Sequence, residues 1–230
     1  STASFHERTF NLKKKIYFPW FVTFYYLKKA PKSQNNSKIA QNQIAISSHK
    51  LRNDVLTTSS DLIRKNVEKI LIANSEDITN AKKKGLNEVF LDRLNLDRSR
   101  IIGISDSIKS LITLPDPLNK ILENWTRPNG LEISKKTTPI GVLGIIYESR
   151  PNVTADASGL AIKSGNSVIL RCGSDSFNSC KIIANLFREA LYKNNLPKDI
   201  IQIIPTIDRD AVGYMLGMSN YIDVIIPRGG

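Results

Sequence analysis

The spacing of apolar residues divides the chain into a helical stretch followed by a stretch of alternating strands and helices. Between residues 39 and 114 apolar side chains recur every three or four positions, which is typical of amphipathic helices, and no run resembles a strand. We predict one helix that spans 62–71, a second that Ser75 caps and Gly85 ends, and a third that begins after Asp97. This part of the chain is therefore expected to be a helical lead-in.

From residue 127 onward, short runs of branched apolar residues alternate with amphipathic segments. Strand–helix–strand units of this kind form parallel sheets with helices packed on them. The predicted fold class is α/β, in which the helical N-terminal lead-in precedes an incomplete parallel, Rossmann-like sheet with flanking helices. The four predicted strands lie at 140–146, 168–170, 200–204 and 221–226, and the three helices between them lie at 153–163, 176–193 and 208–216.

Composition separates residues 1–38 from the rest of the chain. The sequence carries 33 Lys and Arg residues against 21 Asp and Glu residues, which gives a net charge of +12. The first 38 residues hold 8 of those basic residues, a single acid and 9 of the 17 aromatic residues. We predict a basic, aromatic and poorly ordered extension over 1–38. The folded part is expected over 39–230, with the lead-in at 39–114 and the α/β part at 127–230.

The apolar run at 16–27, which lies between lysines, predicts neither a membrane span nor a leader peptide. Its twelve residues include Pro19, whereas a helix needs about 20 apolar residues to cross a bilayer. Lysines follow the run where a leader peptide would have a small-residue cleavage site. Binding to a membrane surface or to nucleic acid through this run stays an alternative. The nearly balanced charge of the remaining chain argues against both partners.

Cysteine and histidine usage indicates a reducing, cytoplasmic compartment and no metal site. Cys172 and Cys180 are the only cysteines, and they form no C-x-x-C pattern. The two histidines, His6 and His49, are far apart in the sequence and have no cluster of further metal ligands at suitable spacing.

Polar residues follow each predicted strand, at the end where parallel sheets bind their ligands. Arg171 and Arg228 stand there among glycine, serine and asparagine residues, a combination that suits a phosphate-bearing ligand. Strand ends also carry polar turn residues for purely structural reasons, and the chain contains no glycine-rich dinucleotide or P-loop motif. Nucleotide binding and ordinary turns both remain open at this point. The candidate segments are 148–152, 171–174, 205–206 and 228–230.

Residues 139–179 read PIGVLGIIYESRPNVTADASGLAIKSGNSVILRCGSDSFNS. This segment resembles the glutamate-5-semialdehyde dehydrogenases, also called gamma-glutamyl phosphate reductases, of the aldehyde dehydrogenase superfamily. Further similar motifs are LDRL at 91–94, RPNG at 127–130 and YIDVIIPRGG at 221–230. The resemblance is collinear over 39–230 and does not include the first 38 residues.

The resemblance implies the NADPH-dependent reduction of L-glutamyl 5-phosphate to L-glutamate 5-semialdehyde, a step of proline biosynthesis. In that reaction a cysteine thiolate displaces phosphate and hydride reduces the resulting thioester. Asn152 matches the amide that stabilises the oxyanion, although the residues alone also allow it to cap a helix. Arg171 and Ser174 match the turn that contacts the adenosine ribose and its 2′-phosphate. The further coenzyme-binding residues that we predict are Arg150, Arg228, Gly229 and Gly230.

The family's nucleophilic cysteine lies beyond the turn that matches residues 228–230. Neither Cys172, which occupies a glycine position of the family's turn, nor Cys180 is expected to replace it. We therefore expect an incomplete NADP-binding domain without its catalytic domain: a truncated homologue from a shortened gene, inactive alone. The alternative is a non-catalytic nucleotide-binding or interaction module. Residues 131–138 resemble the superfamily's oligomerisation arm, which predicts a homo-oligomer and leaves open whether the arm's strand partner is missing.

Overall fold

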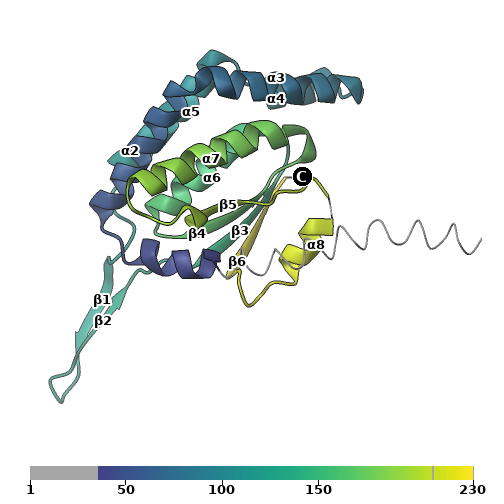
Figure 1. The fold of residues 1–230 in the computed structure, drawn as a ribbon. Coiled ribbons are helices and arrows are strands. Elements are labelled where there is room, and N and C mark those ends of the chain that lie inside the picture. The colour runs from purple at the N-terminus through teal and green to yellow at the C-terminus, as the bar shows by residue number, and fades with distance from the viewer. Residues whose placement is uncertain (1–35, 209, 230) are drawn as a thin grey trace, which may run out of the picture. The chain divides into compact units, whose positions relative to one another are not determined.

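The structure is a computed structural model that describes residues 36–208 and 210–229. Most of the predicted extension, with its apolar run, lies outside the described residues. A helix over residues 36–45 is followed by the elements drawn in Figure 1. In chain order these are α2 (His49–Lys65), α3 (Val67–Lys83), α4 (Glu88–Leu94), α5 (Arg98–Thr113), β1 (Ile121–Thr126), β2 (Glu132–Lys136), β3 (Val142–Tyr147), α6 (Pro151–Lys163), β4 (Ser167–Arg171), α7 (Phe177–Lys193), β5 (Ile201–Ile203), α8 (Asp210–Leu216) and β6 (Val224–Arg228).

The lead-in at 39–114 is described throughout and contains helices and no strand, as predicted. Asp97 caps α5 by accepting a hydrogen bond from the Arg100 amide, and Gly85 takes a φ of 72° just after α3. Two details of the prediction were wrong. The helix expected over 62–71 is interrupted at Asn66, whose side-chain amide donates to a carbonyl of α2. Ser75 lies inside α3 and caps nothing.

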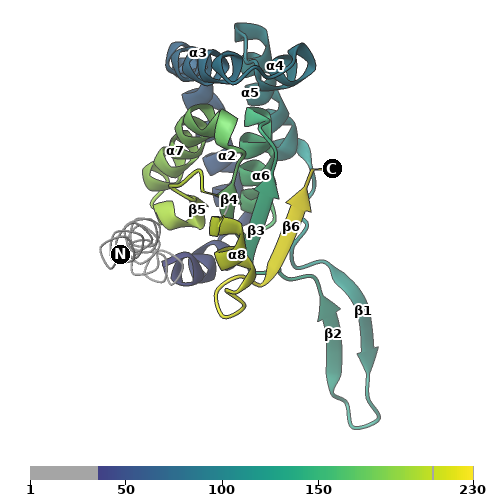
Figure 2. The ribbon, with the colours of Figure 1, turned by 90° about the vertical axis from the view of Figure 1, so that its right-hand side faces the viewer.

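The second half of the chain forms a four-stranded parallel sheet in the order β5-β4-β3-β6, which confirms the predicted fold class. The apolar strand β3 is central, with β4 on one side and β6 on the other (Figure 2). Leu143 of β3 lies opposite both Val168 and Val224 in the two registers. Because all strands run the same way, their carboxyl ends lie at one edge of the sheet.

Alternating side chains of the sheet feed two apolar clusters, one on each face (Figure 1). Leu143 and Ile145 of β3 pack in the larger cluster with α6 and α7, where Phe187 is fully buried. Val142 points to the opposite face and packs with Met215 of α8. This two-residue period explains why β3 is a continuous apolar run: helices cover it from both sides.

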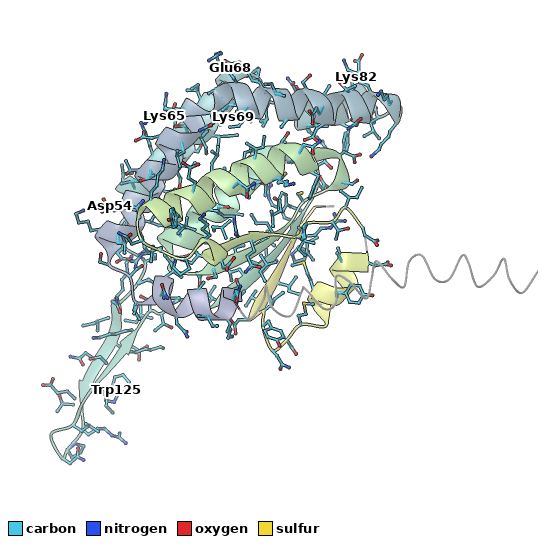
Figure 3. All side chains as sticks on the ribbon, viewed as in Figure 1. Asp54, Lys65, Glu68, Lys69, Lys82 and Trp125 are labelled. Carbon is cyan, nitrogen blue, oxygen red and sulfur yellow. The ribbon has the colours of Figure 1, made fainter. Side chains whose placement is uncertain are left out.

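A two-stranded hairpin connects the lead-in to the sheet. The sequence predicted an arm at 131–138 and left its strand partner open, and the structure supplies that partner as β1, which pairs antiparallel with β2. Trp125 lies opposite Ile133 and is 42% exposed. Figure 3 shows Trp125 on the part of the hairpin that extends away from the sheet. The hairpin therefore presents apolar surface that this chain does not bury.

A buried charged cluster joins the helices at the other edge of the sheet. Arg52 of α2 is only 1% exposed and donates from Nη2 to both carboxylate oxygens of Asp116, each at 2.7 Å. The ammonium of Lys163, at the end of α6, lies 2.9 Å from His49 Nε2 and donates to Asn53 Oδ1 at 3.0 Å. The described carboxylate that balances these two buried cations is that of Asp116.

Candidate functional site

The carboxyl ends of β3 and β6 bring several predicted site residues to the same edge of the sheet. Arg150 directly precedes α6 and Asn152 is the second residue of that helix, while Arg228 ends β6 and Gly229 follows it. These positions result from the parallel pairing, in which Tyr147 lies opposite Arg228. Gly230, the remaining predicted residue of this turn, lies outside the described residues.

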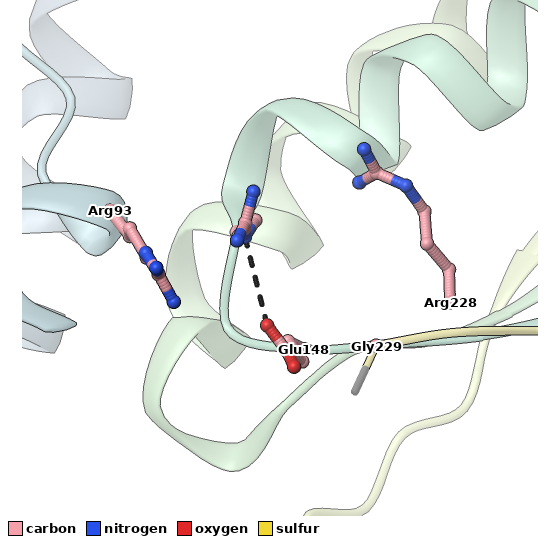
Figure 4. A pocket seen from close by; sticks show the side chains of 5 residues that line it. Arg93, Glu148, Arg228 and Gly229 are labelled. Atoms are coloured by element: carbon pink, nitrogen blue, oxygen red, sulfur yellow. Dashed lines mark ion pairs between the residues drawn. The ribbon is translucent and has the colours of Figure 1, made fainter.

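A cavity of about 310 Å³ opens at this edge and has a strongly basic lining. Figure 4 shows the side chains that surround it, with Glu148 between Arg93 and Arg228. Arg150 Nε lies 3.7 Å from Glu148 Oε2. Three guanidinium groups against one carboxylate leave the cavity with a net positive charge, which favours an anionic ligand. Its lining residues are Arg93, Glu148, Arg150, Arg228 and Gly229.

A second hollow of about 420 Å³ adjoins the first and shares Arg93 and Arg150 with it. Asn152 also lines this hollow, and its exposed amide donates to Asp156 Oδ2 at 3.4 Å. Burial raises the pKa of Asp156, and the charge of Arg228 and the Asn152 hydrogen bond oppose that rise. The alternative that Asn152 caps the helix is wrong, because the cap position belongs to Arg150.

Arg171 and Ser174 lie at the end of β4 and line neither hollow. The Arg171 guanidinium is 8% exposed and donates to the Cys172 carbonyl at 2.7 Å and to two carbonyls of the loop after β5 at 3.3 Å. Its Nε has no hydrogen-bond partner among the described residues. Ser174 is exposed at the start of a short 3₁₀ turn. Arg171 thus holds two loops together, while Ser174 faces outward.

The turns after β3 and β4 touch each other at Gly173. A β-carbon added there would lie 2.2 Å from Ser149 Oγ and 2.7 Å from the Ser149 backbone nitrogen. Such distances are shorter than any van der Waals contact. Glycine at 173 therefore lets the turn that carries Ser174 approach the turn that carries Arg150.

Both cysteines are buried in the main apolar cluster and line neither hollow. The hydrogen bond with Cys180, together with burial, raises the pKa of the Cys172 thiol far above its ordinary value. Cys180 Sγ also lies 3.3 Å from Ser176 Oγ inside the core. A thiol must be accessible and ionised to act as a nucleophile, and these two environments favour neither condition.

Sequence reasoning did not select Arg93 or Asp156 as site residues. Arg93 comes from α4, which lies more than 50 residues before the strands that complete the cavity, so that no local pattern predicts the meeting. The only signal was its place in the LDRL motif of the family resemblance. Within the described ranges, no three potential metal-ligating side chains gather. No helix in those ranges is long and apolar enough to cross a bilayer.

Sequence comparison relates the chain to one family of dehydrogenases. The model of the aldehyde dehydrogenase family matches residues 28–229, a range that reaches further toward the N-terminus than the predicted boundary at 39. The gamma-glutamyl phosphate reductase of Caldanaerobacter subterraneus subsp. tengcongensis is 45% identical over 194 residues, covering 84% of this chain and 47% of the relative. That of Brucella suis is 48% identical over 195 residues, covering 84% and 46%. The chain spans about half the length of these curated relatives.

Solved structures agree with this relationship. The crystal structure of gamma-glutamyl phosphate reductase from Thermotoga maritima matches with a TM-score of 0.85 and 35% identity, over 86% of this chain and 48% of the other. The Saccharomyces cerevisiae enzyme of the same name matches with a TM-score of 0.79 and 32% identity, over 86% and 51%. An engineered glycolyl-CoA reductase with bound NADP+ shares the fold at 16% identity and a TM-score of 0.64. The chain therefore belongs to the aldehyde dehydrogenase family, and its relatives there include gamma-glutamyl phosphate reductases.

Proposed function

We propose that the chain forms the coenzyme-binding part of an NADPH-dependent gamma-glutamyl phosphate reductase that acts in cytoplasmic proline biosynthesis. The observation that carries this proposal is the agreement with gamma-glutamyl phosphate reductases in sequence and fold together, at 45–48% identity and a TM-score of 0.85. The substrate is then L-glutamyl 5-phosphate and the product L-glutamate 5-semialdehyde.

The polar groups at the carboxyl edge of the sheet suit a phosphorylated dinucleotide. Arg150, Arg228 and Gly229 surround a basic cavity where a pyrophosphate would be neutralised. Ser174 stands exposed on the turn after β4, and Arg171 keeps a buried Nε without a partner, so both would serve the ribose end with its 2′-phosphate. When bound, NADPH supplies the hydride of the reaction.

Asn152 is proposed to stabilise the oxyanion. Its amide lies at the first turn of α6, is exposed, lines the second hollow and is engaged only at 3.4 Å by Asp156. A neutral amide donor at this place stabilises negative charge on a reacting carbonyl oxygen. We further propose that neither Cys172 nor Cys180 is the nucleophile, because both are buried beside each other. The chain alone is then expected to bind coenzyme without turning over substrate.

This proposal predicts saturable NADPH binding by the full chain, without reduction of glutamyl phosphate. Fluorescence titration measures the binding, and absorbance of the nicotinamide measures turnover. Arg228→Gln is expected to weaken NADPH binding about tenfold, because one charge-assisted hydrogen bond contributes about 1.5–3 kcal/mol. Absence of saturable binding would contradict the coenzyme role. Turnover that Cys172→Ala abolishes would contradict the statement that the nucleophile comes from elsewhere, whereas tight binding with no role in any reductase would favour the non-catalytic module.

We also propose that the hairpin of β1 and β2 mediates self-association. It exposes apolar side chains on both strands and at its turn, and Trp125 is the largest of them. Trp125→Glu is expected to raise the dissociation constant of the oligomer about thirtyfold, since a buried interface tryptophan often contributes about 2 kcal/mol. Sedimentation velocity over a concentration series measures this. Ile72→Glu alters an equally exposed apolar residue on α3 and should leave association unchanged; equal effects of both substitutions would contradict the proposal.

A further inference from the structure

Arg93 has a free guanidinium at the junction of the two hollows. It lines both of them, together with Arg150. Among the described residues it forms no hydrogen bond or ion pair with its side chain, although its neighbours are paired. Asp92 beside it is neutralised by Arg100, whose Nη2 lies 2.7 Å from Asp92 Oδ1. The local acid is therefore already used, and the charge of Arg93 is uncompensated.

The position of Arg93 is set by the packing of α4. Asn87 caps this helix by accepting from the Phe90 amide, and Leu94 at its end is fully buried. Arg100 also donates to the Asn95 carbonyl at 3.0 Å, which ties the end of α4 to α5. The side chain adjacent to the buried Leu94 is thereby directed outward from a helix end that is held in place. An arginine with a fixed backbone loses less conformational entropy when it binds a ligand.

The charges around the cavity suit a doubly charged anion. Glu148 lies beside Arg150, and Arg93 and Arg228 stand on opposite sides of that carboxylate in Figure 4. With one acid against three arginines, the lining has a net charge of +2. Two guanidinium groups that approach from different elements provide the forked donors that phosphoryl oxygens prefer.

We propose that Arg93 binds a phosphoryl dianion in this cavity, opposite Arg228. The inference rests on the proposed function, in which two such groups occur: the acyl phosphate of the substrate and the pyrophosphate of the coenzyme. Both present the same chemistry to a guanidinium. The junction position, within reach of the hollow that Asn152 lines, explains how one arginine would place a phosphoryl group next to the oxyanion donor.

The test uses the full chain with inorganic phosphate and NADPH as separate probes. Isothermal titration should show phosphate binding by the wild type and about tenfold weaker binding by Arg93→Gln. Arg93→Lys keeps the charge without the fork and should recover part of the affinity. Arg127→Gln removes the same charge from the hairpin turn, outside both hollows, and should change nothing. Because Arg93 is exposed and unpaired, all three variants should melt at the wild-type temperature.

The two probes separate the sources of the anion. A loss of phosphate affinity with unchanged NADPH affinity supports a site for the acyl phosphate, and a parallel loss of both supports a site for the coenzyme pyrophosphate. Phosphate affinity that Arg93→Gln leaves intact, or that Arg127→Gln lowers equally, overturns the inference. Failure of the wild type to bind NADPH counts against the proposed function alone, because the phosphate titration judges Arg93 independently.

Discussion

Replacement of Asp116 by asparagine is expected to lower the free energy of unfolding by about 3 kcal/mol, at the lower end of what breaking a buried ion pair costs. Arg52 would keep its charge while 1% exposed and would lose one of its two carboxylate oxygens and the negative charge of both. Lys163 lies in the same cluster, so the lost carboxylate balances two cations. Urea unfolding followed by circular dichroism measures the change.

The matched control is Asp54→Asn, which breaks an ion pair of the same helix at the surface. Lys50 and Asp54 lie 2.7 Å apart and are largely exposed, and Figure 3 shows Asp54 on the outer side of α2. An exposed pair of this kind contributes about 0.3–0.5 kcal/mol. If both substitutions cost equally little, the pair of Arg52 and Asp116 is not a structural element.

The same aspartate gives the stability a defined pH dependence. Burial raises the pKa of Asp116, but the Leu118 amide and the charge and hydrogen bond of Arg52 outweigh burial, and the net pKa is lower than usual. A carboxyl whose pKa is depressed by folding stabilises the protein above its unfolded pKa of about 3.9, and this contribution is lost as the pH falls through the folded value. The wild type should therefore lose stability below about pH 4, and Asp116→Asn should lose less over the same interval.

Gly173→Ala is expected to destabilise the protein by about 2 kcal/mol, within the range that overpacking a tight site costs. The new methyl group would collide with the Ser149 backbone nitrogen at 2.7 Å, which cannot rotate away as a side chain would. The turns after β3 and β4 must then separate, and NADPH affinity should fall with them. Thermal unfolding and fluorescence titration measure the two effects.

Gly213→Ala makes the same chemical change in α8, where an added β-carbon meets nothing within 4 Å. Because alanine is the better helix former, this control should stabilise the protein by about 0.5–1 kcal/mol. A destabilisation of similar size at both positions would show that contact with Ser149 is not the cause at Gly173.

Local patterns predicted the sheet because its strands are continuous apolar runs and its helices have a clear period. They predicted neither β1 nor the break at Asn66. All residues of β1 are exposed, so its sequence ILENWT shows no buried face, and the break depends on a side chain that bonds to the helix backbone. Ser75 carried the residue type of a cap, yet the buried Ala73 and Asp77 on either side of it extend the helix through that position.

The candidate site was predictable as far as it follows from strand ends. Asn152, Arg150, Arg228 and Gly229 all reach the carboxyl edge of the sheet because they follow parallel strands. Arg93 was not predictable from local pattern, since it arrives from a distant helix through tertiary packing. The bonds of Arg171 to the loop after β5 likewise depend on where two separate loops meet.

The central place of β3 sets an order for folding on the ribosome. β3 meets β4 within about 25 residues of synthesis, but its other neighbour is β6, about 80 residues later, because Leu143 pairs with both Val168 and Val224. At about 5–20 residues per second, the nascent chain carries an unpaired, apolar β3 edge for several seconds. An edge of this kind attracts foreign strands, so the interval before β6 emerges is when this fold depends most on chaperones.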